Sequence, residues 1–577
     1  MLQKTFPSPE TLQRFSCGLS DVAVTLGTLV LLGVIAYISQ GTFVPFVPPN
    51  TVPSISLDPH YLPYYAGRST LRMFIALFCS TIFALVYGYV AARNRYAERI
   101  MVPLLDILQS VPVLGFLSVT VTGFIALFPG SLLGLEAACI FAIFTSQAWN
   151  MTFSFYQSLK MVPHELDEAA TLYQFTGWQR FTQLELPNAT IALLWNAMMS
   201  FGGGWFFVAV SENISVLNQK YTLPGIGSYV AAAVAAKDLS ALGWALLTII
   251  VVIVLVDRLF WSPLNAWAQK FRLEQSVTTT GTESWLLDLL KAARLLRLMR
   301  QIFAPIGEIF NRFMSFLTPP RSFQPRETTG QQWSDRIYNL ILLLLVGALL
   351  VAGVHFILAT VGLSEVFKTF LLGLLTLGRV LIVLVIGTLI WTPVGVAIGF
   401  NPKLANLLQP VVQFLASFPA NFIFPFATLF FIRANISLDW GSILLMSLGA
   451  QWYILFNAIA GAMSVPTDLR EMASDVGLRN GLLWRKLILP SIFSAWITGG
   501  ITAVGGAWNA SIVSEVVSWG QTTLTARGLG AYIAQATTVG DWSRITLGVG
   551  MMSLYVIGMN QLVWRRLYQL AENKYHL

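Results

Sequence analysis

The sequence predicts an all-α polytopic membrane protein, and two observations lead to that fold class. Of the 577 residues, 55% are hydrophobic and only 11% are charged, whereas an average soluble protein carries roughly 25% charged residues. The apolar runs are continuous and about 20 residues long, as a helix that crosses roughly 30 Å of hydrocarbon requires. Barrel strands would instead alternate over roughly 10 residues. A soluble enzyme, a nucleic-acid-binding protein and a disordered scaffold are therefore excluded.

The cysteines and histidines indicate neither a disulfide framework nor a metal site. Cys17, Cys79 and Cys139 form no pairing pattern and are expected to be small buried residues. The four histidines have no ligand-like spacing, so no metal site is predicted. The first apolar run, 22–38, lacks a small-residue cleavage site and is expected to remain in the membrane as an anchor helix.

Twelve apolar windows predict membrane helices, in two sets of six. The third window of each set contains a proline, Pro112 or Pro419, which predicts a kink or a partial unwinding. The first set is 20–42, 70–92, 103–128, 133–156, 190–212 and 239–260, and the second set is 337–361, 372–399, 406–432, 438–463, 493–514 and 545–564.

The distribution of positive charge predicts the orientation. The net charge is +8, and most of the 35 Lys and Arg residues lie on the inner side when both termini are placed in the cytoplasm. Because each set has an even number of spans, the two sets are expected to be parallel.

In the linker 262–335, cations recur every three residues among leucines between Lys291 and Arg300. This pattern predicts a basic amphipathic helix on the anionic inner leaflet, with packing on the protein's own cytoplasmic face as the alternative.

The two sets are copies of each other, because a fixed offset of 303 residues aligns them over a long stretch. Pro, Glu, Gly and Trp are kept at matched positions, which indicates that both halves retain the same specialised parts. The matches include Val162-Pro163 with Val465-Pro466, Glu168 with Glu471, Leu186-Pro187 with Leu489-Pro490, Gly202-Gly203 with Gly505-Gly506, Trp205 with Trp508, Ser211-Glu212 with Ser514-Glu515 and, at an offset of 307, Arg72 with Arg379.

The loop between the fourth and fifth spans of each half, 162–187 and 465–490, has the pattern of an exposed elbow. Each loop starts with a proline at a first helical position and has acidic residues in the next turn. We expect a short helix, a break, and a second helix that ends at Leu-Pro. Ala169-Ala170 and Ala473 are expected to form a low surface that fits a groove of another protein.

These loops resemble the EAA loop of the permease subunits of binding-protein-dependent ABC importers. The family pattern is Glu-Ala-Ala, three residues, Gly, nine residues, an apolar residue, any residue and Leu-Pro. The second copy matches at Glu471, Ala473, Gly477, Leu487, Leu489 and Pro490, with Met472 in place of an alanine. The first copy matches at Glu168, Ala169, Ala170, Leu184, Leu186 and Pro187, with Gln174 in place of the glycine and Gly177 three residues further on.

The resemblance covers about 68–260 and 372–566, and is strongest to permeases of the nitrate, sulfonate and taurine type and to duplicated anion-transport permeases. It implies two parallel six-helix repeats of the type I importer kind in a bacterial or archaeal inner membrane. It also implies that the elbows dock on two copies of an ATP-binding subunit and that a solute-binding protein delivers a small anion. The chain has no Gly-x-x-x-x-Gly-Lys-Ser/Thr loop. ATP is therefore expected on the partner subunit, with no cofactor and no enzyme activity in this chain.

The repeat also predicts how the chain is divided. The predicted segments are an anchor helix with an outer loop (1–67), a first permease domain (68–261), a cytoplasmic linker (262–335), an additional membrane helix (336–371) and a second permease domain (372–577).

Polar residues inside the spans are candidates for the translocation pathway or its gate, because such residues are costly in a membrane and face partners or water. For the glutamates that close the fifth span of each half, a structural role and substrate contact both remain open. Arg72 and Arg379 lie near outer helix ends and are expected to snorkel. The candidates are Gln147, Asn150, Asn196, Ser200, Ser211 and Glu212 in the first half and Gln451, Asn457, Asn509, Ser514 and Glu515 in the second.

Two other functions are weighed against an importer subunit. An ion-coupled secondary transporter with six-plus-six parallel repeats would have ionisable residues deep in its spans, and few are evident. A structural or export-assembly protein would give no reason for two copies of the elbow.

Overall fold

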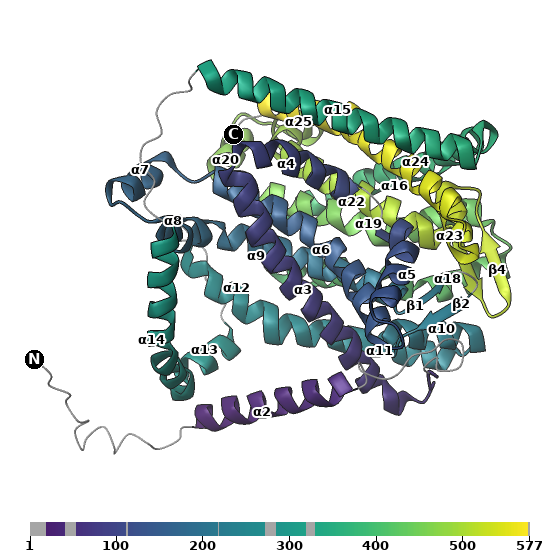
Figure 1. The fold of residues 1–577 in the computed structure, drawn as a ribbon, viewed down its shortest axis with the longest axis horizontal. Coiled ribbons are helices and arrows are strands. Elements are labelled where there is room, and N and C mark those ends of the chain that lie inside the picture. The colour runs from purple at the N-terminus through teal and green to yellow at the C-terminus, as the bar shows by residue number, and fades with distance from the viewer. Residues whose placement is uncertain are drawn as a thin grey trace, which may run out of the picture. The chain divides into compact units, whose positions relative to one another are not determined.

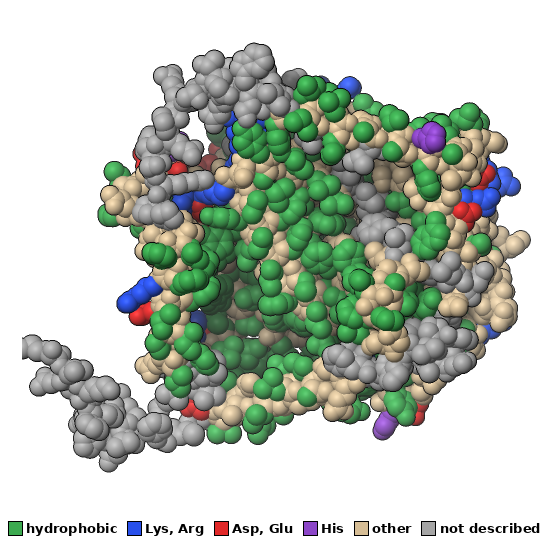
Figure 2. Space-filling view, in the orientation of Figure 1, with side chains coloured by type: hydrophobic (Ala, Val, Ile, Leu, Met, Phe, Trp, Pro, Cys, Tyr) green, Lys and Arg blue, Asp and Glu red, His purple; other side chains and the backbone are tan. Residues whose placement is uncertain are grey.

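The computed structural model describes residues 19–40, 54–110, 113–216, 219–271, 284–318 and 329–574. In this part of the chain nearly every element is a helix, and two short β-hairpins are the exceptions (Figure 1). On the visible face, hydrophobic side chains predominate and charged ones are few (Figure 2). The predicted all-α membrane fold class is therefore confirmed. Cys17 and Pro112 lie outside the described residues.

The chain forms two compact units, and each unit joins segments that are far apart in the sequence. The first unit comprises Met1–Thr42, Ser154–Trp195 and Val254–Pro325. Its elements are α2 (Leu19–Ser39), the end of α6 (Leu133–Lys160), α7 (His164–Leu172), α8 (Gly177–Arg180), η4 (Phe181–Glu185), the start of α9 (Leu186–Ser211), the end of α11 (Leu239–Val256), η5 (Asp257–Trp261), α12 (Ser262–Ala268), η6 (Gln269–Phe271), α13 (Trp285–Ala292) and α14 (Arg294–Leu317).

The second unit comprises Phe43–Phe153, Asn196–Ile253 and Arg326–Leu577. From the first half it contains η2 (Pro59–Tyr61), α3 (Leu62–Arg93), α4 (Arg95–Ser110), η3 (Val113–Phe116), α5 (Leu117–Leu127), most of α6, α9 and α11, β1 (Asn213–Val216), β2 (Gln219–Thr222) and α10 (Ile226–Ala236). From the second half it contains α15 (Thr329–Thr360), α16 (Leu363–Gly399), α17 (Pro402–Ser417), η7 (Ala420–Phe422), α18 (Phe424–Ala434), α19 (Leu438–Met463), α20 (Thr467–Asp475), α21 (Asn480–Leu483), η8 (Trp484–Ile488), α22 (Leu489–Ser514), β3 (Val516–Trp519), β4 (Thr522–Thr525), α23 (Leu529–Val539), α24 (Trp542–Met559), η9 (Asn560–Trp564) and α25 (Arg565–Lys574).

The duplication seen in the sequence recurs in the order of the elements. The run from α3 to η5 matches the run from α16 to η9 helix by helix, including the hairpin after the fifth span. Each hairpin is antiparallel, and Asn213 pairs with Thr222 as Val516 pairs with Thr525. The helices α2 and α15 are additions to the two copies.

Eight helices in the described part are long and apolar enough to cross a membrane. They are Asp21–Ser39, Pro59–Arg93, Gly177–Ser211, Leu239–Phe271, Leu363–Gly399, Leu438–Met463, Asn480–Ser514 and Trp542–Ala571. The predicted windows 103–128 and 406–432 are each divided between two helices, and the second break lies at Pro419, as predicted. The window 133–156 lies in α6, which carries several polar residues, and the window 337–361 lies in α15.

Two further expectations are corrected. Cys139 is buried, but Cys79 is exposed on α3, so only one of the two described cysteines fills a core position. The linker was predicted to form one amphipathic helix, and it forms two, because α13 ends before Ala293, which takes an extended conformation (φ −66°, ψ 121°).

Close packing between the halves of the second unit depends on a glycine of α9. A Cβ atom on Gly202 would lie 2.6 Å from Oγ of Ser417, which is the last residue of α17. The glycine therefore permits a close helix approach at this point. At Gly505 in the second copy, a Cβ atom would meet nothing within 4 Å.

Candidate coupling elbows and buried charge clusters

The first elbow, residues 162–187, lies in the first unit and has the predicted helix–break–helix form. Its first helix, α7, follows Pro163 and has Glu165 and Asp167 in its first turn, where acidic side chains stabilise a helix. The second helix, α8, begins at a capping box between Thr176 and Gln179. The second elbow, residues 465–490, lies in the second unit and repeats this order with α20 and α21.

The bend after the first helix has the same backbone geometry in both elbows. Gln174 has φ 53° and Gly477 has φ 74°, so both residues are left-handed. The following N–H returns to the carbonyl of Ala170 at 3.0 Å or to that of Ala473 at 2.8 Å, which closes the helix end in the same way. Gln174 therefore makes the glycine bend, at a cost of roughly 1–2 kcal/mol for a residue with a Cβ atom.

The Leu-Pro pair of each elbow marks a widened helical turn. A five-residue π-helical turn precedes Leu186-Pro187, and another precedes Leu489-Pro490. Proline has no N–H to give to the preceding turn, and a π-bulge is one way for a helix to accommodate that loss. The expectation that the second helix ends at Leu-Pro is therefore wrong. No loop interrupts the backbone here, and the elbow continues directly into α9 or α22.

The exposed end of each elbow is acidic and apolar rather than alanine-rich. Ala170 and Ala473 are 5% and 6% exposed, so they pack inside the elbow and do not form the low outer surface that was expected. Glu168 and Glu471 are exposed and make no hydrogen bond or ion pair with a described residue. The surface is completed by exposed apolar residues in and just after the first helix of each elbow, of which Tyr173 and Val476 occupy matched positions. We call these two surfaces the elbow tips: Glu168, Leu172 and Tyr173 in the first, and Glu471, Met472 and Val476 in the second.

Different contacts hold the two elbows together. In the first elbow, Arg180 forms ion pairs with Asp167 and with Glu185, the latter at 3.0 Å. In the second elbow, Arg470 stands at the position of Asp167 and donates to the carbonyl of Val465 at 2.8 Å. Its guanidinium also lies 4.6 Å from the centre of the Phe400 ring. The elbow geometry is thus kept while the charge at one position is reversed.

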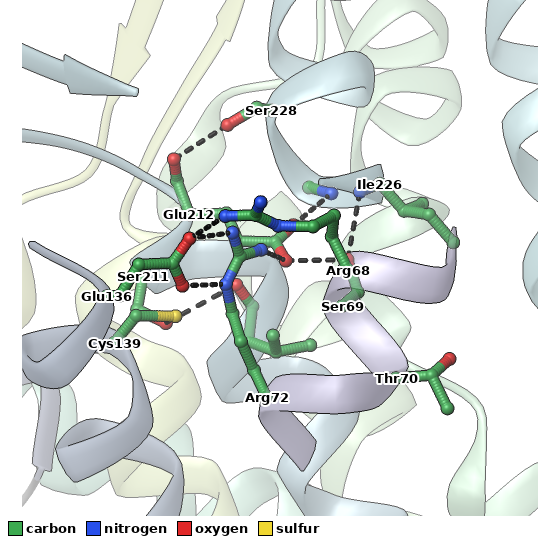
Figure 3. A network of polar contacts seen from close by, with 12 residues as sticks. Arg68, Ser69, Thr70, Arg72, Glu136, Cys139, Ser211, Glu212, Ile226 and Ser228 are labelled. Atoms are coloured by element: carbon green, nitrogen blue, oxygen red, sulfur yellow. Dashed lines mark hydrogen bonds and ion pairs between the residues drawn. The ribbon is translucent and has the colours of Figure 1, made fainter. Parts of the chain in front are cut away.

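A second duplicated feature is a buried charge cluster beside each β-hairpin. In the first half, Arg72 of α3 donates from Nη1 to Glu212 at 2.6 Å and from Nε to Glu136 at 2.6 Å (Figure 3). Arg68, one helical turn earlier, also pairs with Glu136. The Oγ of Ser69 donates to Glu212 at 2.6 Å. All of these side chains are at most 3% exposed.

The cluster ties α3 to the segment that follows the hairpin. The N–H of Gly227 donates to the Glu212 carboxylate at 2.7 Å, and the N–H of Ile226 donates to Ser69 at 3.0 Å. The backbone carbonyl of Glu212 accepts from the Ser228 hydroxyl at 2.6 Å and from the Leu223 N–H at 2.8 Å. Several donors therefore meet one buried carboxylate, which offsets much of the cost of taking it out of water.

The second half contains the same arginine–glutamate pair, with fewer charged residues around it. Arg379 of α16 donates from Nη1 to Glu515 at 2.8 Å and from Nη2 to Asp439 at 2.8 Å. Glu515 also accepts from Oγ1 of Thr376 at 2.8 Å and from the N–H of Ala531 at 3.0 Å. The side chain of Asp439 is 43% exposed, in contrast to 3% for its counterpart Glu136.

A family model matches the chain twice, over residues 84–260 and 391–565. Its description is binding-protein-dependent transport system inner membrane component. The chain belongs to this family. Both elbows, and the glutamates Glu212 and Glu515, lie inside the matched stretches, so this protein is a fused, internally duplicated permease.

Curated relatives of the permease are transport subunits rather than enzymes. The bicarbonate transport system permease protein CmpB of Synechococcus elongatus is 28% identical over 28% of this chain and 56% of its own length. The nitrate import permease protein NrtB of the same species is 27% identical over 33% of this chain and 66% of its own length. The taurine transport system permease protein TauC of Escherichia coli is 26% identical over 28% and 55%. The matches thus span between about half and two thirds of these relatives.

The two matched arginines in the spans of the permease do not reach toward the membrane surface as predicted. Arg72 and Arg379 do not snorkel, because both are buried and paired with the glutamates that end the fifth span. Sequence reasoning missed Arg68, Glu136 and Asp439 altogether. The sequence did contain a signal for this cluster. Glu136 and Asp439 are related by the offset of 303 residues, and the matched arginines Arg72 and Arg379 carry the opposite charge on another span of each half.

The remaining polar candidates of the permease do not converge on one site. Gln147 is fully buried, and neither of its amide atoms has a partner among the described residues. A Cβ atom on Gly204 would lie 2.9 Å from its Nε2. Most of the others have local partners: Asn150 accepts from Gln109, Gln451 accepts from Trp391, Asn457 and Asn509 donate to carbonyls of their own helices, and Ser211 bonds to Cys139 and Phe207. Ser200 and Ser514 are buried without a partner among described residues, and Asn196 is half-buried. Their assignment to a pathway stays a prediction.

Proposed function

We propose that this chain is the membrane-spanning subunit of an ABC importer and that it supplies both permease domains of the complex. ATP is bound and hydrolysed by separate subunits that dock on the two elbows. The chain lies in a bacterial or archaeal inner membrane, with both termini in the cytoplasm. The observation that carries this proposal is the presence of two elbow tips with one backbone geometry, each continuous with a membrane helix.

The construction of the elbows supports a mechanical role. Tyr173 is 79% exposed and Val476 is 74% exposed, although both are large hydrophobic side chains on loops that would face the cytoplasm in the proposed orientation. Exposed apolar side chains of this kind are suited to a protein interface. The buried alanines and the continuous turn before Leu-Pro make each elbow rigid. A force on the tip would therefore move α9 or α22 as a whole.

A small anion is the proposed substrate, and the support comes from the relatives rather than from a cationic site. The relatives are named for bicarbonate, nitrate and taurine transport. In the charge clusters, Arg72 and Arg379 already face carboxylates, so these clusters offer no unpaired positive charge to an anion. Selection of the anion would then depend on a separate solute-binding protein and on neutral donors along the path.

The buried clusters give little support to the ion-coupled alternative. A coupling carboxylate must exchange its cation or proton during transport. Glu212 and Glu515 are each held by an arginine, a hydroxyl and a backbone N–H. Such an arrangement fixes a carboxylate in one state, as expected for a structural clasp.

Purification of the tagged chain from native membranes in mild detergent tests the proposal. We expect an ATP-binding subunit to copurify with the wild type, and a solute-binding protein to identify the ligand for binding assays. The double variant Glu168→Lys plus Glu471→Lys should lose the ATP-binding subunit, because it reverses the charge of both elbow tips.

A matched control changes charge by the same amount at sites away from the tips. Asp288→Lys plus Glu308→Lys alters two exposed acidic residues of the linker helices, and this variant should retain the ATP-binding subunit. If cross-linking captures no ATP-binding subunit with the wild type, the elbows are not docking sites and ion-driven transport becomes the leading function.

A further inference from the structure

The linker helix α14 is fastened to the first elbow by a set of specific contacts within the first unit. The backbone N–H groups of Gly177 and Trp178 donate to the carbonyl and to Oγ1 of Thr318, at 3.0 and 2.9 Å. The indole Nε1 of Trp178 donates to Oδ1 of Asn311 at 2.9 Å. The same indole meets the ring of Phe310 edge-on, with 5.7 Å between ring centroids. The end of α14 therefore holds α8.

The second elbow has different residues at these positions. Asn480 and Gly481 replace Gly177 and Trp178, and both are exposed. A glycine has no side chain to make the indole contacts. This contact is therefore a feature of the first elbow, although the two elbows share one backbone geometry.

The opposite side of α14 is apolar and uncovered. With 3.6 residues per turn, Asn311 and Thr318 lie on one side of the helix, while Ile302, Ile306, Ile309 and Phe313 gather on the other. These four apolar side chains are 57–69% exposed. The helix thus contacts the elbow with the side that carries Asn311 and Thr318, and it leaves a continuous apolar stripe exposed, as an interfacial helix does.

The charge of this segment indicates what covers the stripe. Residues 284–318 contain five Lys and Arg and two Asp and Glu, a net charge of +3, and three of the arginines fall in the first two turns of α14. The helix contacts α2, which is a candidate membrane span of the same unit. The helix α14 itself is not one of the described helices that are apolar enough to cross a membrane. A basic amphipathic helix that adjoins a span, but is too polar to form one, suits an anionic lipid surface.

We propose that α14 lies on the anionic inner leaflet and fixes the first elbow to it, so that lipid charge sets how firmly that elbow is held. The second elbow is independent of this control. The consequence for transport rests on the proposed function, because it requires that the elbow docks an ATP-binding subunit. The structural claim itself concerns this chain and lipid alone.

Hydrogen–deuterium exchange of the full chain in nanodiscs tests the claim without an ATPase. One set of discs contains phosphatidylcholine, and the other contains phosphatidylcholine with phosphatidylglycerol. We expect anionic lipid to slow exchange in α14 and in residues 164–185 by at least about five-fold, which is the contribution of a single arginine near an anionic surface. Exchange in residues 467–488 should be the same in both discs, and high salt should remove the difference.

Two variants separate the lipid contact from the elbow contact. Arg297→Gln plus Arg300→Gln should abolish the effect of anionic lipid, whereas the control Arg565→Gln plus Arg566→Gln, which removes two exposed arginines from α25, should preserve it. Asn311→Ala plus Thr318→Ala should leave α14 protected by anionic lipid while residues 164–185 lose their protection.

Several results would overturn the proposal. Equal exchange of α14 in both discs would show that anionic lipid does not cover it. Protection that depends on protein concentration rather than on lipid would identify a second copy of the chain as the occupant. Protection of α14 without any change in residues 164–185 would show that the helix does not hold the elbow. Failure to capture an ATP-binding subunit would contradict the proposed function and leave these measurements intact.

Discussion

Glu136 in the first half is enclosed by Arg68 and Arg72, whereas its counterpart Asp439 in the second half is 43% exposed and meets only one arginine side chain, that of Arg379. The arginine–glutamate pair beside each hairpin is nevertheless the same in both halves. Each glutamate also accepts from a hydroxyl, at the matched positions Ser69 and Thr376, and from a backbone N–H, that of Gly227 or that of Ala531. The comparison separates a shared clasp, which fixes the end of the fifth span, from the second carboxylate of each cluster, Glu136 or Asp439, which has diverged.

The largest effect is expected from removal of the shared arginine. Arg72→Met would leave Glu212 buried without a guanidinium, and breaking a buried pair in this way costs about 3–5 kcal/mol. Arg379→Met should lie at the lower end of that range, because one of its two acidic partners is partly solvated. Thermal unfolding of the detergent-purified variants measures both costs.

A double variant checks the reason for that loss. Arg72→Met plus Glu212→Met removes both charges and should recover part of the stability. If the single variant Arg72→Met is as stable as the wild type, the cluster does not hold the fold together.

The next largest effect should distinguish the halves. Glu136→Gln removes the charge that two buried arginines share and is expected to cost about 2–3 kcal/mol. Asp439→Asn affects a partly exposed pair and should cost about 1 kcal/mol or less. Paired melting curves of the two variants give the difference, and equal losses would contradict the view that the second carboxylate of each cluster has diverged.

A change at the matched glycines tests the part that the halves share. A Cβ atom on Gly225 would overlap the carboxylate of Glu212, and one on Gly528 would overlap that of Glu515. Each change to alanine is expected to cost about 1–3 kcal/mol, as overpacking does. The control Gly243→Ala, where a Cβ atom meets nothing within 4 Å, should not destabilise the protein and should gain up to about 1 kcal/mol, because alanine favours a helix over glycine. A loss in one half alone would show that the clasps are not equivalent.

The smallest effect concerns the elbows. Gln174→Gly should stabilise the first elbow by about 1 kcal/mol, because it removes a Cβ atom from a left-handed residue. Gly477→Gln should destabilise the second elbow by a similar amount. Hydrogen–deuterium exchange or limited proteolysis of the two elbow loops measures both changes in stability. If neither variant differs from the wild type, the bend is not under strain.

The elbows show how much of a loop's structure can be predicted from its local sequence. Their order of proline, acidic turn, short helix and Leu-Pro predicted the helix–break–helix form, because each of those features acts on the neighbouring backbone. The bend at Gln174 could not be settled in that way, since a glutamine seldom takes φ 53° without support from surrounding structure. The burial of Ala170 also depends on packing that the loop sequence does not contain.

The sequence by itself determined that this protein is helical, crosses a membrane and is internally duplicated, because hydrophobicity, span length and a fixed repeat offset are local or periodic properties. That it is a permease was implied by the resemblance of its two loops to the EAA loop. Only the tertiary structure decided what the charges do. Arg72 and Glu212 are 140 residues apart, and Trp178 and Asn311 are 133 apart. Partners at such separations meet through helix packing, which no local pattern encodes. The buried clasps and the hold of α14 on the first elbow therefore became visible only in the folded chain.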